Sequence, residues 1–505
     1  MFIVTAKEMY DIDHYTMQTI GYGNLLMENA GRAVAEKITK IISKEEPISV
    51  FVGTGHNGGD GYVVARTLWN IGYDIEVIQV GENEKLKPEV RFHKQLFINC
   101  RGTVHVAVDD ETLQHVFTNK KVVIDALIGI GLTENIREPI ATAISLINKE
   151  AEMIVSVDIP SGLPSDEGNL SSIAIQAHHT ITIGAPKMSM FIPSTEDFYG
   201  NWDVVSIGHS PFVFEKYTNR IMITKELFQQ TMPRRKKSAH KGDHGRGLII
   251  GGCDNMPGAL AMAVKAALKT GAGLMTARST KQVINRISSQ CLEAMYEEYP
   301  DQDGYLVVQN KPAFSDKLQA VAIGVGIGRN PNTAKVIKEA IEHVSCPLIV
   351  DADGLYHLSQ MQHVLKQRSS PTIITPHTGE MARLLGVSIE KLMQRPFHYA
   401  REYATTYQTY VILKGRHTII TSPTGEQAVN MTGNPGLAKG GSGDVLTGII
   451  TAMVMQKMSI FQALCNACFV HGMSADILVA DNHTYYDLLA TDVIEGIANV
   501  YRTFL

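Results

Sequence analysis

The sequence predicts an α/β protein whose first half is doubly wound and is followed by a second α/β unit. Three observations favour this class. Short apolar segments of strand length alternate with helical segments in both halves of the chain. With 505 residues the chain is too long for one ordinary core, so two or three domains are expected. Its 43 glycines suit many tight turns between strands and helices.

A strand–helix–strand unit opens the first half. Residues 48–52 form a continuous apolar run, typical of a buried strand, and 53–61 form a glycine-rich turn. Helical periodicity follows over 62–71, and residues 74–80 are the next expected strand. Strands joined in this way are parallel and have a right-handed crossover, which predicts a Rossmann-like doubly wound domain. Further strands are expected at 121–125, 153–158 and 180–184.

The alternation stops near the middle of the chain. Residues 234–237 are Arg-Arg-Lys-Lys and lie within a polar stretch. A basic run of this kind is usually a solvated connector rather than a binding site. We therefore expect a linker at 216–240 between domains at 1–215 and 241–505.

The alternation of strands and helices then begins again. An alanine-rich helix is expected at 257–270, and two closely packed helices are expected at 443–455 and 461–475. This pattern predicts a second α/β domain. Its expected strands lie at 247–251, 274–278, 320–324, 347–351, 371–375 and 410–414.

Composition narrows the kinds of partner. Hydrophobic residues make up 44% of the chain and charged residues 19%, and the net charge of −5 argues against nucleic-acid binding. The first ten residues contain Lys7 and Glu8 and no long apolar region, so no signal peptide is expected. No membrane span is expected either. Six thinly spread cysteines indicate a reducing compartment, and we expect a cytoplasmic protein.

A glycine-rich turn near the end of the chain is the strongest chemical signal. Residues 440–444 are Gly-Gly-Ser-Gly-Asp, and a helix is expected to begin beside them. Glycines allow several N–H groups to point into one space, and the helix start adds partial positive charge, which favours a phosphoryl group. Asp444 is placed to accept a proton from an attacking hydroxyl. The alternative is a plain turn with a helix cap at Ser442 or Asp444.

Three strand ends in the same half carry polar residues. Residues 414–418 (Lys-Gly-Arg-His-Thr) suit the phosphates of a nucleotide, and residues 375–380 (Thr-Pro-His-Thr-Gly-Glu) follow a buried strand where open α/β sheets bind ligands. Asp351 and Asp353 follow another strand and either organise Mg²⁺ through water or cap the next helix. Taken singly, the histidine and glutamate of 375–380 are equally consistent with an ordinary loop and helix start.

A family resemblance covers this half, from about residue 241 to the end. Segments 324–328, 351–354, 375–380, 414–418 and 440–448 resemble, in order, the motifs of the ADP-dependent NAD(P)H-hydrate dehydratase of the ribokinase-like superfamily. This resemblance implies repair of hydrated NADH or NADPH: ADP phosphorylates the added hydroxyl, which then leaves. Mg²⁺ is the implied metal. The chain departs from the family at Lys439, where threonine is usual, so a changed nucleotide preference is an open alternative.

The resemblance also assigns roles to residues of the second half. Asp444 is implied as the catalytic residue at the substrate hydroxyl. The implied contacts with the hydrate are Ala259, Gly326, His377, Gly379, Glu380 and Asp444. The implied nucleotide-binding residues are Lys414, Gly415, Arg416, His417, Thr418, Asn434, Gly440, Gly441, Ser442 and Gly443.

Oxygen-bearing side chains follow three strands of the first half. Asn57 lies in the first glycine turn, Asp125 ends a second strand, and Asp158 and Ser161 follow a third. Parallel strands bring such ends together, so Asn57, Asp125 and Ser161 could hold a hard monovalent cation while Asp158 remains free as an acid or base. Each residue alone is more often a turn former or cap. The turn itself fits the dinucleotide fingerprint poorly and lacks a Walker lysine.

This arrangement resembles the NAD(P)H-hydrate epimerase domain over about residues 1–215. The motifs are 57–61 (Asn-Gly-Gly-Asp-Gly), 125–131 (Asp-Ala-Leu-Ile-Gly-Ile-Gly), 158–162 (Asp-Ile-Pro-Ser-Gly) and 27–31 (Met-Glu-Asn-Ala-Gly). The resemblance implies catalysis by Asp158 and K⁺ held by Asn57, Asp125 and Ser161. The chain departs at His56, where the family usually has asparagine. The implied substrate contacts are His56, Asn57, Gly58, Gly59, Asp60, Gly129, Ile130, Gly131, Leu132, Thr133, Glu134, Asn135 and Asp158.

The two resemblances together imply one repair function. The first domain would interconvert the R and S hydrates, and the second would dehydrate the S form with ADP. The implied partners are therefore the small molecules NADHX, NADPHX and ADP, with no nucleic acid and no membrane, and a homo-oligomer is expected. One alternative is a hydroxymethylpyrimidine-type small-molecule kinase with an N-terminal binding scaffold. Another is a non-enzymatic first domain, which the presence of Asn57 and Asp158 disfavours.

Overall fold

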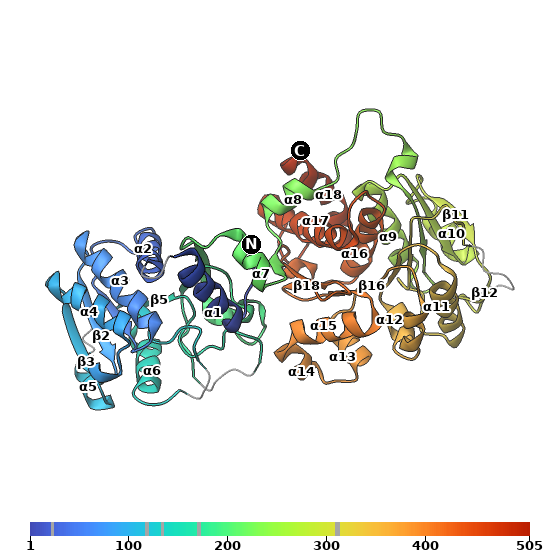
Figure 1. The fold of residues 1–505 in the computed structure, drawn as a ribbon. Helices are drawn as coiled ribbons and strands as arrows, with labels where there is room; N and C mark the ends of the chain where they lie inside the picture. Colours follow the sequence, from blue (N-terminus) through green and yellow to red (C-terminus); the bar gives the residue numbers. More distant parts are fainter. Residues whose placement is uncertain (22–24, 117–120, 133–135, 169–172, 309–313) are drawn as a thin grey trace. The chain divides into compact units, whose positions relative to one another are not determined.

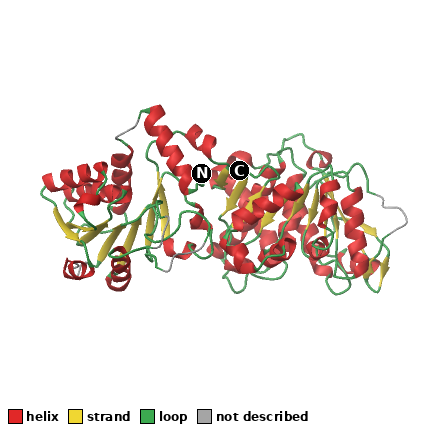
Figure 2. Ribbon diagram, turned by 60° about the horizontal axis from the view of Figure 1, so that its bottom comes forward, coloured by secondary structure: helices red, strands yellow, loops and turns green. Residues whose placement is uncertain are grey.

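The computed structural model describes residues 1–21, 25–116, 121–132, 136–168, 173–308 and 314–505. The chain divides into two compact units, Met1–Asn219 and Arg220–Leu505 (Figure 1). Strands and helices alternate in both units, and each sheet carries helices on both faces (Figure 2). The predicted α/β class is confirmed.

The first unit is built on a seven-stranded parallel sheet with the order β3-β2-β1-β4-β5-β6-β7. Chain direction across the sheet reverses between β1 and β4, which is the point where doubly wound sheets bind ligands. The strands are β1 (Ile48–Val52), β2 (Ile75–Val80), β3 (Thr103–Ala107), β4 (Val122–Ala126), β5 (Met153–Val157), β6 (His179–Ile183) and β7 (Asn201–Val205).

Helices cover both faces of this sheet. One face packs on α2, α3 and α4, and the other packs on α5 and α6. Every residue of β1 and β4 is buried, as their apolar sequences predict for strands with helices on either side. The helices are α1 (Ala6–Tyr15), α2 (Leu26–Ile38), α3 (His56–Asn70), α4 (Pro88–Asn99), α5 (Asp110–Val116), α6 (Ile140–Glu150) and α7 (Pro211–Tyr217).

Helix α3 begins at His56, six residues before the expected start at 62. Most of the glycine turn predicted at 53–61 is therefore the first part of this helix. Glycines occupy this part of the helix because its backbone packs closely: a Cβ on Gly58 would lie 2.0 Å from the carbonyl oxygen of Gly53. The glycines let the helix start directly on the end of β1, which places its uncapped N-terminus over the sheet edge.

The second unit contains a ten-stranded sheet with the order β11-β10-β9-β14-β15-β16-β17-β18-β19-β8. Its strands are parallel except for β18, which runs antiparallel to both of its neighbours, β17 and β19. The strands are β8 (Arg220–Met222), β9 (Arg246–Ile250), β10 (Leu274–Ser279), β11 (Met295–Glu298), β14 (Ala320–Ile323), β15 (Leu348–Val350), β16 (Thr372–Ile374), β17 (Tyr410–Leu413), β18 (Thr418–Thr421) and β19 (Gln427–Asn430). A separate hairpin is formed by β12 (Asp301–Gln302) and β13 (Tyr305–Leu306).

The large core of this unit lies between the sheet and the helices α9, α16, α17 and α18. Helices α11 to α15 lie on the other side of the sheet (Figure 1). The helices are α8 (Lys225–Thr231), α9 (Pro257–Thr270), α10 (Lys281–Ile287), α11 (Pro331–His343), α12 (Asp353–Leu358), α13 (Thr378–Leu385), α14 (Ile389–Gln394), α15 (Pro396–Tyr407), α16 (Ser442–Val454), α17 (Ile460–Asp481) and α18 (Ala490–Phe504).

Residues 220–231, expected to be part of a linker, instead belong to the second unit. Strand β8 pairs in parallel with β19, and α8 packs on α17. Phe228 of α8 is buried and stacks on Phe469 with ring centroids 4.5 Å apart. The apolar residues of this short segment complete the sheet edge and the core, which the basic run just after them concealed in the sequence.

Helix α17 is long and apolar enough to cross a membrane by length and composition alone. However, 72% of its most apolar window is buried inside the protein. Cys465 and Cys468 lie on this helix, and both are buried in the core with free thiols. The apolar character of α17 is explained by its place between the sheet and α18.

Candidate functional sites

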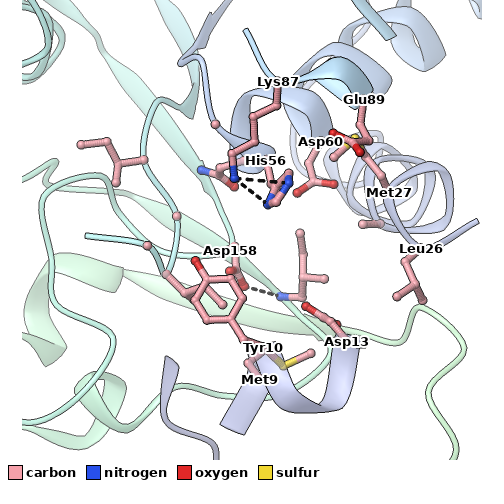
Figure 3. A pocket seen from close by; sticks show the side chains of 18 of the residues that line it. Met9, Tyr10, Asp13, Leu26, Met27, His56, Asp60, Lys87, Glu89 and Asp158 are labelled. Carbon is pink, nitrogen blue, oxygen red and sulfur yellow. Dashed lines mark hydrogen bonds between the residues drawn. The ribbon is translucent and has the colours of Figure 1, made fainter. Parts of the chain in front are cut away.

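The first unit contains a cavity of about 830 Å³ at the carboxyl ends of β1, β4 and β5. Residues from the expected motifs line it, including His56, Asn57, Asp60, Gly129 and Asp158 (Figure 3). Ile130 and Gly131 also line it. The sheet therefore brings together residues that lie about a hundred positions apart in the sequence, at the edge where parallel sheets bind ligands.

Some of the expected substrate contacts lie elsewhere. Gly58 and Gly59 are buried behind the cavity, where Gly58 faces the Gly53 backbone and Gly59 packs against Met27. Leu132 is not among the residues that line the cavity. Thr133, Glu134 and Asn135 lie outside the described residues.

Asp158 follows β5 in a left-handed backbone conformation with φ of +67°. This conformation is uncommon for a residue with a Cβ, and it directs the carboxylate back toward the sheet edge. Its Oδ1 accepts hydrogen bonds from the ammonium of Lys187 and from the backbone N–H of Ile183, at 2.9 Å for the latter. Lys187 is fully buried. This buried ion pair fixes the position of the Asp158 side chain in the cavity wall.

Lys187 was missed by sequence reasoning. It lies in a polar-to-apolar stretch after β6 and carries no motif signal, although its ammonium also donates to Thr182 Oγ1 at 3.2 Å and to the Ile183 carbonyl at 2.8 Å. A lysine with no exposed surface requires this set of partners. Only the fold brings it to Asp158.

Asp125 and Ser161 meet below the cavity, as the sequence predicts. The Asp125 carboxylate accepts hydrogen bonds from the hydroxyl of Ser161 at 2.6 Å, the N–H of Ser161 at 2.9 Å and the hydroxyl of Ser156 at 2.8 Å. The pKa of Asp125 is raised because burial outweighs the opposing effect of these hydrogen-bond donors. Asn57 lies beside Gly129, and its Nδ2 is buried with no hydrogen-bond partner in the described part of the chain.

Acidic and basic side chains from α3 and α4 complete the cavity. Burial, with the nearby charges of Asp158 and Asp13, raises the pKa of Asp60 well above its ordinary value. The ring of His56 lies within 3.5 Å of the ammonium of Lys87. Burial and this neighbouring ammonium lower the pKa of His56, so its ring is neutral at physiological pH. The histidine that replaces the family's usual asparagine therefore still offers an uncharged polar group.

The second unit places its glycine-rich turn at the start of α16. Gly441 is the N-cap residue with φ of +95°, a conformation that favours glycine, and the helix begins at Ser442. A Cβ on Gly443 would lie 3.4 Å from the ammonium of Lys414 and 3.9 Å from Oδ2 of Asp351. The helix start, a lysine and an aspartate thus meet at one point, although they come from three separate segments of the chain.

A buried ion pair supports this helix start. Lys414, at the end of β17, donates to Oδ1 of Asp351 at 3.0 Å, and Thr447 of α16 donates to Oδ2 at 2.6 Å. The charge of Lys414 and these donors outweigh burial, so the pKa of Asp351 is lowered. The pKa of Lys414 is raised because the carboxylates around it outweigh its own burial.

Asp444 lies in the first turn of α16 beside this pair. Burial and the negative charge of Asp351 raise the pKa of Asp444 to about 7, against an opposing effect of Lys414. A carboxyl with a pKa near physiological pH is well matched to accept and release a proton. Perturbed pKa values of this kind are typical of functional sites.

The expected hydrate contacts form two groups. A Cβ on Gly326 would lie 2.8 Å from Cβ of Ala259, so these two small residues lie against each other. His377, Gly379 and Glu380 form the start of α13, where Nδ1 of His377 accepts from the N–H of Gly379 at 3.0 Å and Glu380 accepts from the N–H of His377 at 2.8 Å. These contacts form a capping box.

The remaining nucleotide candidates lie in two loops. Gly415, Arg416 and His417 connect β17 to Thr418, the first residue of β18. Asn434 is oriented by Asp476 of α17, which accepts from its side-chain amide at 2.9 Å and from the N–H of Gly433 at 2.8 Å. Asp476 was missed because no sequence pattern links α17 to this loop.

Two further residues modify the expected picture. Lys439 donates to the carbonyl oxygen of Tyr486, so the lysine that departs from the family pattern has a backbone partner. His471 of α17 lies near Ser442 and Lys414, and burial lowers its pKa to about 4. A neutral imidazole therefore stands beside the glycine-rich turn. Sequence reasoning missed it because a lone histidine in an apolar helix is usually a core residue.

The fold and the two sites define a two-domain class of α/β protein, a Rossmann-like unit followed by a ribokinase-like unit. Residues 247–499 match the family described as NAD(P)H-hydrate dehydratase, and residues 23–189 match the family described as YjeF-related protein N-terminus. A protein of Moorella thermoacetica named bifunctional NAD(P)H-hydrate repair enzyme Nnr is 34% identical over 99% of this chain and 97% of its own length. A protein of Escherichia coli with the same name is 32% identical over 94% of this chain and 89% of its own.

The chain belongs to the family of bifunctional NAD(P)H-hydrate repair enzymes. Because these relatives span both units, the alternative of a small-molecule kinase with an unrelated N-terminal partner is not favoured. Among solved structures, a Bacillus subtilis ADP/ATP-dependent NAD(P)H-hydrate dehydratase co-crystallised with ATP and Mg²⁺ is 33% identical, with a TM-score of 0.49, and covers 56% of this chain and 99% of that one.

Proposed function

We propose that the first unit interconverts the R and S hydrates of NADH and NADPH and that the second unit dehydrates the S form with ADP. The observation that carries this proposal is Asp444, whose pKa is raised to about 7 at the glycine-rich start of α16. A proton acceptor at a phosphate-binding helix start suits phosphorylation of a hydroxyl. Because the chain belongs to the repair family, we take that hydroxyl to be the one that water adds to the nicotinamide ring of NADH or NADPH.

The proposed dehydration begins with proton transfer to Asp444. The substrate hydroxyl loses its proton to this carboxylate as its oxygen attacks the terminal phosphorus of ADP, and AMP leaves. The N–H groups at Gly440, Gly441, Ser442 and Gly443, with the ammonium of Lys414, stabilise the charge of the transferred group. The phosphate ester is a good leaving group, so the C–O bond then breaks, a ring proton is lost, and NADH or NADPH and inorganic phosphate result.

Contacts in the second unit indicate how Mg²⁺ would be held. Both oxygens of Asp351 accept from Lys414 and Thr447, and both oxygens of Asp353 accept from Gly328 and Arg329. These carboxylates therefore do not fit a cage made by the protein alone. Mg²⁺ usually retains water and binds through substrate phosphates, so we assign it to the nucleotide, where it would neutralise phosphate charge.

In the first unit the proposed acid–base residue is Asp158. The buried ammonium of Lys187 donates to its carboxylate and positions it, and this carboxylate would accept a proton from the substrate or from water and return it. Asn57, Asp125 and Ser161 bring oxygen atoms to the loop after β4, and oxygen is the ligand type of a hard monovalent cation such as K⁺. Ser156 and Ser161 already donate to the two oxygens of Asp125, so K⁺ would share these oxygens with the serines. When bound, K⁺ would supply a fixed positive charge beside the substrate phosphates.

Two activities in one chain have a chemical reason. Hydration of the ring gives both epimers, and a dehydratase that reads one stereocentre would leave the other hydrate unrepaired. The choice of ADP rather than ATP rests on the family resemblance, since glycines and a helix start bind either nucleotide. We also propose that the protein is cytoplasmic and forms a homo-oligomer. Each domain would carry one of the two activities.

The proposal is tested with the purified full-length protein and separated hydrate epimers. With ADP and Mg²⁺, the S hydrate should yield NADH and AMP, and Asp444→Asn should abolish this reaction. Without nucleotide, the R hydrate should convert to the S hydrate, and Asp158→Asn should abolish that conversion. If the protein ignores both hydrates and instead phosphorylates a vitamin precursor with ATP, the kinase alternative is correct and this proposal is wrong.

A further inference from the structure

Asp13 of α1 faces the same cavity as Asp158, although it belongs to none of the motifs named above. Both carboxylates line the cavity, and the side chain of Asp13 is 29% exposed. Figure 3 shows Asp13 and Tyr10 entering from α1, across the cavity from His56 and Asp60 of α3. Burial raises the pKa of Tyr10, and the negative charges of Asp13 and Asp158 raise it further.

A buried histidine stands behind Asp13. His209 has a side chain only 2% exposed, and its Nε2 lies 3.0 Å from Oδ1 of Asp13. Its other ring nitrogen, Nδ1, lies 3.0 Å from the hydroxyl of Thr16, which is fully buried. The ring also packs edge-on against Phe214 with centroids 5.7 Å apart. Asp13, His209 and Thr16 therefore form a line from the cavity into the protein.

The backbone after α1 has an unusual conformation where it brings Thr16 to His209. Helix α1 continues directly into a π-helical turn at Thr16–Ile20. Such turns are rare, and many occur at functional sites. This turn carries Thr16 into the interior, where its hydroxyl meets His209. In the described residues, neither Oδ1 of Asp13 nor Nε2 of His209 has a well-directed hydrogen bond, even though the two atoms lie close together.

The cavity thus presents two carboxylates, each backed by a buried basic side chain: Asp158 by Lys187 and Asp13 by His209. Moving a hydroxyl from one face of a ring carbon to the other is assisted by one group that protonates the leaving hydroxyl and a second group that deprotonates the water entering on the opposite face. We propose that Asp13 is the second proton-transfer residue of the first unit, acting with Asp158, and that His209 is its positioning residue. This inference rests on the epimerase activity proposed above and adds a catalytic residue to it.

The proposed step conserves atoms and electrons. Asp13 as a carboxylic acid gives its proton to the ring hydroxyl, the C–O bond breaks with its electron pair on oxygen, and water leaves while the ring nitrogen lone pair forms a C=N bond. A water molecule then adds to the opposite face, the π pair returns to nitrogen, and Asp158 accepts one proton of that water, which leaves the new hydroxyl group on the carbon. The proton on Asp158 then passes to solvent, and Asp13 takes one up before the next turnover. Nothing is oxidised or reduced, and the reverse reaction exchanges the roles of the two carboxyls.

The first test compares two substitutions on the same helix. Asp13→Asn should lower kcat for conversion of the R hydrate by about 100-fold or more. Asp11→Asn makes the same change at a surface carboxylate that pairs with Lys7, and it should leave the rate unchanged. ADP-dependent dehydration of the S hydrate, catalysed by the second unit, should be normal in both variants, and equal thermal unfolding of the two variants reports that the first unit is intact.

The outcomes distinguish a failure of the proposed epimerase activity from a failure of the proposed role of Asp13. If the unaltered protein fails to convert the R hydrate, the epimerase proposal itself is wrong. If the unaltered protein converts it and Asp13→Asn does so at a similar kcat, Asp13 is not catalytic and the further inference is overturned.

The role of His209 is tested by two amides of different reach. Glutamine can place its amide nitrogen near the Nε2 position facing Asp13, whereas asparagine can replace only the Nδ1 contact with Thr16. If His209 positions Asp13, His209→Gln should keep more of kcat than His209→Asn, with similar KM in both. If His209 merely fastens α1 to the loop after β7, the order should be reversed, and this result would overturn its positioning role.

Discussion

The ammonium nitrogen of Lys414 lies 3.0 Å from Oδ1 of Asp351, and this buried pair sits directly beside the first turn of α16. The two residues are 63 positions apart and follow β15 and β17, which lie on either side of β16 in the sheet. Their pairing fixes a positive charge beside the glycine-rich turn and a negative charge beside Asp444. The chemistry assigned to Asp444 depends on both.

Breaking this pair from one side should be costly. Lys414→Met leaves Asp351 buried without its counter-charge, so the second unit should lose about 3 kcal/mol of its free energy of unfolding. The double variant Lys414→Met with Asp351→Leu removes both charges and should recover part of this loss, while dehydration remains absent. Chemical denaturation of the single and double variants checks this, and equal stability of Lys414→Met and the unaltered protein would show that the pair is not a buried one.

The pH dependence of dehydration should follow Asp444. Its carboxylate accepts the hydroxyl proton, so only the ionised form is active, and the rate should fall as the pH drops below about 7. The rate should be level above that pH until another group titrates. Values of kcat/KM for the S hydrate across the pH range check this, because kcat/KM reports the pKa of the free enzyme. A rate that stays constant down to pH about 5 would contradict a pKa raised by burial.

The same residue should reduce stability where it is ionised. The pKa of Asp444 in the folded protein is raised from 3.8 to about 7, so folding loses stability as the pH rises through this range. The loss corresponds to at most about 4 kcal/mol. Asp444→Asn should therefore unfold at a higher temperature than the unaltered protein at pH about 8 and should differ little below pH about 4. Differential scanning calorimetry of both proteins at the two pH values measures these unfolding temperatures and tests whether the active-site carboxylate lowers stability.

The buried lysine of the first unit should matter for both folding and catalysis. Lys187→Met leaves the Asp158 carboxylate without its ammonium and should cost about 3 kcal/mol of stability and most of the epimerase activity. Adding Asp158→Asn to this variant should restore stability but not activity. Unfolding curves and R-hydrate conversion measured on the same samples distinguish the two effects, and an active Lys187→Met protein would remove this pair from the mechanism.

Two glycines at the start of α3 offer a matched comparison. A Cβ on Gly58 would lie 2.0 Å from the Gly53 carbonyl oxygen, whereas a Cβ on Gly55 would have no atom within 4 Å. Gly58→Ala should therefore destabilise the first unit by several kcal/mol (about 2 or more), while Gly55→Ala should be nearly neutral. Thermal unfolding of both variants checks the close approach of α3 to β1, and similar effects of the two substitutions would contradict it.

The sequence was sufficient for the class of fold and most strands of the sheets, because buried parallel strands are short apolar runs with glycines after them. The expected strand at 48–52 matches β1 at both ends. The start of α3 was placed six residues late because glycines usually mark turns, and their role here is to permit close packing. Strand β8 was hidden because three residues at a sheet edge carry little periodic signal.

The sites were predictable only in part, for a related reason. Asp125, Asp158 and Asp444 stand in glycine-containing motifs at the ends of strands or the start of a helix, so local sequence reveals them. Lys187 and His209 act through contacts 29 and 196 positions away along the chain, which no local pattern encodes. Their identification needed the fold.

The most direct test of the bifunctional assignment is the extent of repair of an equal mixture of R and S hydrates. With ADP and Mg²⁺, the unaltered protein should restore all of the reduced-nicotinamide absorbance, first from the S hydrate and then from R as it is converted. Asp158→Asn should restore the S portion rapidly and then stop. If the unaltered protein also stops when the S portion is consumed, or if repair proceeds without nucleotide, the assignment of the two activities to this chain is wrong.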